Sequence, residues 1–298
     1  MKTLLFMVCV IVVAGIAPLF ALSETLAEID RLHQDDQHDA VLQIIANTLP
    51  GRSGAERGAL LWREGRARMQ IADFGHHDGD LSDGETIAML QETERLAQEA
   101  SQLAPNAAEP WFWLGAAMGR RGQVQGVLNS LFMAGDVRDN AVEALNRREE
   151  FSEAFFLLGQ VYRELPGRPL SFGNNDYAVS MARRAIVIHE AERAAGIAPN
   201  KSHDLYTQLG AALWKRNHNE RQRRRAWDSA VRGWNSASTP LERGFYFEGS
   251  LPYSGGTDRA EARALVQQIE RELQGIRNRS ARQQRDLEKA QALLSDWG

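Results

Sequence analysis

The chain has 298 residues, 25% of them charged, and a formal net charge of −4 at pH 7. This near-balance excludes a strong attraction of the whole chain to nucleic acid or anionic lipid. The single cysteine, Cys9, lies near the N-terminus, so we expect no disulfide, thiol nucleophile or thiolate metal site beyond it. No cofactor is expected either.

The first 23 residues predict an export signal. Lys2 precedes an apolar run over residues 4–17, and small residues precede the bond between Ser23 and Glu24. We expect cleavage at that bond and a periplasmic or secreted mature protein. The alternative is an uncleaved inner-membrane anchor, because residues 4–22 could just cross a bilayer. Lipidation is not expected, because the apolar run continues beyond Cys9.

Three segments share one pattern: an aromatic residue, then Leu-Gly, then a large residue. They are residues 111–118, 155–162 and 206–213, and a degenerate copy covers residues 61–68. This pattern resembles the first helix of the tetratricopeptide repeat, whose glycine lets two helices approach closely. Alanines at second-helix spacing follow in residues 97–100 and 178–185.

The expected fold is therefore all-α: an α-α superhelix, or tetratricopeptide-like solenoid, with irregular inserted loops and a C-terminal helical cap. A partial first repeat is predicted from helices over residues 24–33 and 39–49. The glycines of successive copies lie farther apart than a unit of roughly 34 residues. The excess is assigned to loops over 72–85, 122–135 and 166–175, with a second helix extended to Gly196.

Three regions follow from this pattern: a signal peptide over residues 1–23, a repeat array over 24–256, and capping helices over 257–298. A polar loop over 236–257 carries the triplet Phe245-Tyr246-Phe247, which we expect to pack back onto the array. Apolar residues at helical spacing from Ala262 onward predict the two helices of the cap.

Residues 119–132, 141–145 and 155–162 together resemble the regulator of microtubule dynamics group. They are also similar to its bacterial relatives, which include periplasmic partners of TRAP transporters, and residues 169–175 look like an inserted loop of those proteins. This resemblance implies a helical-repeat scaffold without enzymatic activity.

Two clusters of charged side chains have a simple structural interpretation. Residues 73–85 combine histidines and carboxylates that could hold a divalent cation, but a solvated surface loop is favoured and no metal site is assigned. The arginine run at 221–225 could grip phosphate, but its acidic neighbours favour a solvated helix face. Binding of nucleic acid is therefore not expected.

The candidate site is the concave groove, which the first helices line in repeats of this kind. Aromatic and basic residues at matching repeat positions would suit an extended peptide with apolar and acidic side chains. The predicted stripe consists of Trp62, Arg66, Phe112, Arg120, Phe156, Gln160, Arg163 and Trp214. The alternative is that inserted loops cover this stripe and make it part of the core.

These features predict an exported scaffold that binds a protein or peptide partner and has no contact with the membrane beyond a retained leader. A second hypothesis is a periplasmic accessory protein of a transporter, whose loops enclose a small molecule. A third is an enzyme with a site built across repeats. An open groove would favour the first hypothesis, and a closed apolar cavity the second. The oligomeric state is not predictable from the sequence.

Overall fold

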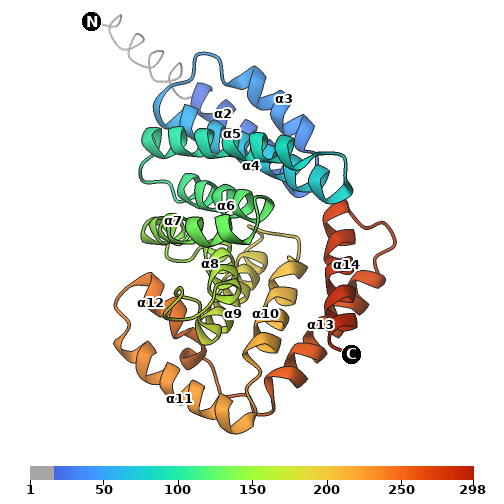
Figure 1. The fold of residues 1–298 in the computed structure, drawn as a ribbon. Helices are drawn as coiled ribbons and strands as arrows, with labels where there is room; N and C mark the ends of the chain where they lie inside the picture. Colours follow the sequence, from blue (N-terminus) through green and yellow to red (C-terminus); the bar gives the residue numbers. More distant parts are fainter. Residues whose placement is uncertain (1–16) are drawn as a thin grey trace, which may run out of the picture.

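The computed structural model describes residues 17–298, with side chains from Leu22 onward, and in this range the chain forms helices and no strands (Figure 1). The all-α prediction is confirmed. The helices are α2 (Ala17–Gln34), α3 (His38–Thr48), α4 (Gly54–Asp78), α5 (Asp83–Leu103), α6 (Glu109–Val124), α7 (Val127–Arg147), α8 (Ser152–Glu164), α9 (Asn175–Ala194), α10 (His203–Arg216), α11 (Glu220–Ser236), α12 (Pro240–Phe245), the 3-10 helix η1 (Phe247–Ser250), α13 (Asp258–Gln274) and α14 (Ala281–Asp296).

Local sequence signals fix several helix ends. Ser82 and Glu85 form a capping box that starts α5. The side chain of each residue accepts a hydrogen bond from the backbone N–H of the other. Pro110 occupies the first turn of α6, where its missing N–H costs nothing. Gly79 ends α4 with a positive φ of 81°, a conformation that residues with a Cβ rarely adopt.

Successive helices pack as antiparallel pairs: α4 with α5, α6 with α7, and α8 with α9. We call α4, α6, α8 and α10 the first helices. Close approach within a pair depends on the repeat glycine, because a Cβ atom on Gly115 would lie 3.1 Å from the carbonyl oxygen of Val137. Leu158 and Gly159 are buried as the repeat pattern predicts, whereas Leu114 is only half-buried. The pairs stack into the predicted α-α superhelix.

The fourth pair is interrupted. α10 packs on α13 rather than on α11, and a Cβ atom on Gly210 would lie 2.4 Å from Cγ2 of Val266. α13 is therefore the second helix of this pair, and only α14 remains as the predicted cap. The segment from α11 to η1, which we call the insertion, lies outside the pair, at the lower left of Figure 1.

Aromatic residues and buried ions attach the insertion to the array. The ring of Phe245 stacks on Tyr177 of α9 at 4.1 Å, and Phe247 is 3% exposed, which confirms that the aromatic triplet packs back. Arg216, at the end of α10, donates to both carboxylate oxygens of Asp258 at 2.8 and 2.9 Å. It also bonds Glu248 of η1 at 2.6 Å, so α10, η1 and α13 meet at one guanidinium.

Two of the three predicted loop insertions are wrong. Residues 72–85 form the end of α4 and the start of α5, and residues 122–135 form the end of α6 and the start of α7. Extending the helices keeps the backbone hydrogen bonds intact, which a long loop would have to satisfy with water. The third prediction is confirmed: residues 166–174 are non-helical, and α9 is long, ending at Ala194.

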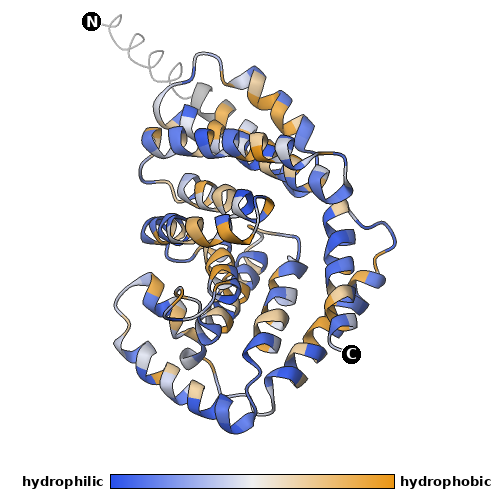
Figure 2. Cartoon of the chain, in the orientation of Figure 1, coloured by the Kyte–Doolittle hydropathy of each residue, from blue (hydrophilic) through white to orange (hydrophobic). Residues whose placement is uncertain are grey.

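The apolar run of the predicted leader, with Lys2 and Cys9, lies almost entirely outside the described residues, and export stays a prediction. The proposed cleavage bond between Ser23 and Glu24 lies inside α2. Among the described helices, none combines the length and the apolar character that crossing a membrane requires. Figure 2 shows hydrophilic residues along most of α11 and α14, whereas α8, inside the array, is richer in apolar ones.

Candidate functional site

The first helices contact one another in order, α4 with α6, α6 with α8, and α8 with α10. This arrangement brings the predicted stripe residues onto neighbouring helices. The side chains differ widely in accessibility along that series, however, and the differences decide which part of the face could meet a partner.

At α4 the stripe lies in the interior. Trp62 is 7% exposed and belongs to a core cluster with Leu96 and Ala100 of α5. Arg66 is also buried and donates to Asp30 of α2 at 2.7 Å. Burial lowers the pKa of Arg66 to about 10, because removal from water disfavours its charged form. Both residues serve the packing of α4 in this conformation.

At α6 the aromatic residue is again core. Phe112 is 6% exposed, and its ring lies 5.3 Å from Phe151, at the N-cap of α8. Arg120, near the C-terminal end of α6, is partly exposed and donates to Asp73 of α4 at 2.6 Å. A partner-binding role for Trp62 and Phe112 remains a prediction that would require these side chains to leave the core.

At α8 the stripe becomes accessible. Phe156 and Gln160 are half-buried, and the carbonyl oxygen of Phe156 accepts a hydrogen bond from Gln208 of α10 at 2.8 Å. Arg163 bonds its neighbour Glu164 at 2.8 Å, while its Nη1 atom is buried without a hydrogen-bond partner.

At α10 the stripe is half-buried, and the residue that covers part of it comes from the C-terminal end of the chain rather than from an inserted loop. The ring of Trp214 stacks on Trp297, just after α14, at 4.4 Å and nearly parallel. Arg259 of α13 lies 4.6 Å from the centre of the Trp214 ring. Trp297, near the C-terminus, was the one sequence signal that could have indicated this contact with Trp214.

α14 continues from this contact to the opposite end of the array. Its Arg285 bonds Asp78 of α4 at 3.0 Å and lies 3.5 Å from the ring centre of Phe74. Its Arg282 bonds Asp36, in the turn between α2 and α3, at 3.0 Å. Figure 1 shows α14 running beside the array toward the turn between α4 and α5. We call this set of polar contacts the α14 bridge; sequence reasoning missed it.

A buried carboxyl group lies within the bridge. Asp286 of α14 is 9% exposed, and its burial, together with the negative charges of Asp204 and Asp36, raises its pKa to about 7. Lys289 and Arg282 oppose this rise. The bridge therefore contains a group that changes charge near neutral pH.

The region of residues 73–85 is organised by helix ends. His76 lies on α4 and its Nε2 atom is 3.0 Å from Asp83, at the start of α5. In the described part of the chain, no three histidine, cysteine or carboxylate side chains gather closely enough to hold a metal ion.

A shallow groove of about 390 Å³ is lined by residues of α5, α6 and α7. Trp111, Leu114 and Met118 of α6 line it, together with carboxylates of α5 and α7. This groove explains why Leu114 is only half-buried.

Protein-family models and curated proteins were compared with the chain. Neither comparison gave a match. The likeness to tetratricopeptide proteins therefore rests on the repeat pattern and on the helical architecture described above.

Proposed function

We propose that this chain is an exported helical-repeat scaffold, similar to tetratricopeptide proteins, that binds a protein or peptide partner on its concave face. The observation that carries the proposal is the partly exposed part of the stripe at α8, where Phe156, Gln160 and Arg163 lie between the buried Phe112 of α6 and Trp214 of α10, which stacks on Trp297. Lys215 lies beside it and donates to the carbonyl oxygen of Arg163.

The chemistry of this part of the face suits a segment with a carboxylate or carbonyl next to an apolar side chain. Arg163 and Phe156 both have partly exposed side chains here. Arginines and aromatics at the centre of an interface usually contribute most of the binding free energy.

The second candidate is a periplasmic accessory protein that holds a small molecule beneath α14. The bridge from α10 to α4 favours it, because such a strap could close over a ligand. A small molecule would be enclosed by mainly apolar side chains with a few polar groups.

The test is site-specific photo-crosslinking in the native host. A photo-reactive phenylalanine analogue replaces Gln160, and the control places it at Val187, which is 44% exposed on α9. We expect one protein adduct from position 160 and none from position 187. Equal labelling at both positions, or no protein adduct from position 160 in the folded protein, would contradict the proposal. A small-molecule adduct would favour the second candidate.

Export is tested separately by mass spectrometry of protein from the native host. The expected N-terminus is Glu24, because small residues precede that bond. An intact Met1 in the membrane fraction would instead assign the leader as an anchor.

A further inference from the structure

The insertion carries an arginine cluster that the concave face does not explain. Of the run at 221–225, Arg223 is 5% exposed and lies 3.2 Å from Asp258 of α13, so it belongs to the buried contact between α11 and α13. Arg221, Arg224 and Arg225 are exposed on α11. They line an open depression of about 860 Å³, with Tyr253 on its far side.

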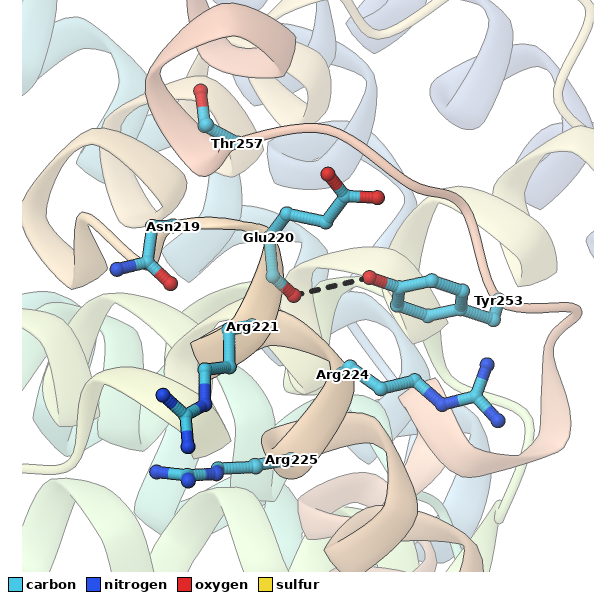
Figure 3. A pocket seen from close by; sticks show the side chains of 7 residues that line it. All are labelled: Asn219, Glu220, Arg221, Arg224, Arg225, Tyr253 and Thr257. Atoms are coloured by element: carbon cyan, nitrogen blue, oxygen red, sulfur yellow. Dashed lines mark hydrogen bonds between the residues drawn. The ribbon is translucent and has the colours of Figure 1, made fainter.

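Figure 3 shows how these side chains lie. Arg221 and Arg225, one helical turn apart on α11, point to the same side of the helix. Arg224 points the other way, toward Tyr253, whose hydroxyl donates to the carbonyl oxygen of Glu220 at 3.1 Å. Two cations are therefore presented together.

Neither cation of this pair is ion-paired among the residues that the structure describes, and the carboxylate of Glu220, which also lines the depression, points away from both (Figure 3). Within residues 17–298, Arg221 and Arg225 take part in no hydrogen bond or ion pair, whereas Arg224 lies 3.4 Å from Asp228. Like charges held close together repel, and a carboxylate placed between them would turn this repulsion into charge-assisted hydrogen bonds. The pair is also a local positive region on a chain of net charge −4.

The surroundings select the class of anion. Asn219 and Gln222 form a capping box at the N-terminus of α11. The backbone N–H groups at this helix start are therefore less available to bind a phosphate. Stacking of nucleic-acid bases is also disfavoured, because Arg224 already covers the rings of Trp227 and Tyr253 at 5.1 and 4.9 Å.

We infer that Arg221 and Arg225 form a docking surface for an acidic segment of a partner protein, bound by its carboxylates. The depression is open to solvent beside α11, which suits an extended chain. Because the insertion lies outside the array, this surface is independent of the concave face and of any partner bound there.

The test is fluorescence anisotropy with a labelled ten-residue peptide of alternating glutamate and glycine, titrated with the full chain. The variants are Arg221→Gln/Arg225→Gln and the single Arg225→Gln. The matched control is Arg232→Gln, an exposed arginine on the same helix. We expect the double variant to weaken binding about tenfold or more, and added salt to weaken binding to the wild type. Arg232→Gln should stay within about twofold of the wild type.

Several results would overturn the inference. One is equal binding by the wild type and the double variant, and another is no binding of the glutamate peptide at low salt. A third is equal binding of a peptide in which glutamine replaces glutamate. The last is tighter binding, dependent on Arg221 and Arg225, of a single-stranded oligonucleotide or of vesicles containing phosphatidylglycerol. Circular dichroism checks that each variant is folded, which we expect because the substituted side chains are exposed.

Discussion

Arg216 and Arg285 both reach from one helix to a carboxylate on another, but in opposite surroundings. The Arg216 side chain is 2% exposed and its partner Asp258 is fully buried. The Arg285 side chain is 16% exposed and its partner Asp78 is 51% exposed. The first pair joins α10, η1 and α13, and the second joins α14 to α4.

The difference in burial determines how much the stability of the fold depends on each contact. Removing one partner of a buried pair leaves an uncompensated charge in the interior, whereas water and salt replace an exposed partner at little cost. α13 is therefore an integral part of the array. The exposed Arg285–Asp78 contact of the α14 bridge, by contrast, contributes little to the stability of the rest of the chain.

The largest effect is expected from Asp258→Ala. This change removes one carboxylate from the buried guanidiniums of Arg216 and Arg223, which lie 2.8 and 3.2 Å from it, and leaves their positive charge only partly compensated. We expect a loss of about 3–5 kcal/mol in the free energy of unfolding, measured by urea titration. The matched control, Asp78→Ala at the exposed pair, should lose about 1 kcal/mol or less. Similar losses of stability for the two variants would contradict the contrast between the buried α10–α13 contact and the exposed α14–α4 contact.

Gly210→Ala tests the apolar part of the same α10–α13 seam. The new methyl group would lie 2.4 Å from Cγ2 of the buried Val266, so the two helices must move apart. We expect a loss of roughly 1–3 kcal/mol. Gly84→Ala is the control, because a Cβ atom there meets nothing within 4 Å. If the Gly210 variant unfolded at the wild-type urea concentration, the assignment of α13 as second helix would be wrong.

Asp286→Asn tests how the stability contributed by the α14 bridge depends on pH. The folded pKa of Asp286, about 7, lies above its ordinary value of 3.8, so the folded state retains the proton longer. Its contribution to stability therefore falls as the pH rises from about 4 to about 7. We expect the variant to gain on the order of 1 kcal/mol over the wild type at pH 8, and the gap to narrow toward pH 5. A pH-independent gap between Asp286→Asn and the wild type would contradict the raised pKa of Asp286.

The smallest effect is expected from Arg285→Gln, which removes the contacts with Asp78 and Phe74. Global stability should fall by only about 0.2–1 kcal/mol. Hydrogen exchange should nevertheless become faster in the first turns of α14 and stay unchanged in α13. Unchanged exchange in α14 would mean that the bridge does not hold this helix in place.

The part of the fold that could be predicted is the part encoded locally. The glycine, aromatic and leucine of each first helix are close in sequence, so their pattern identified α4, α6, α8 and α10. The pairing of α10 with α13 could not be found this way, because the insertion separates Gly210 from Val266 in the sequence. The end of α4 was also missed, because Gly75, His76 and His77 have weak helix propensity and tertiary packing overrides it.

The candidate site was predictable only as a face. Repeat positions placed Phe112 and Phe156 on neighbouring first helices, but they carry no information on what covers each ring. Phe112 is covered by Phe151, and Trp214 by Trp297, residues that stand outside the aligned segments. The exposure of Gln160 and the burial of Trp62 therefore had to come from the structure.

The insertion between α10 and α13 also affects the order in which the chain can fold. The earlier pairs can form as soon as two adjacent helices have been synthesised, because their contacts are local. α10 must wait until residues 217–257 have followed it and their loop can close, at an entropic cost that grows with loop length. During synthesis its apolar face, with Leu209 and Leu213, therefore stays without its α13 partner longest, which makes this face the expected point of contact for a chaperone.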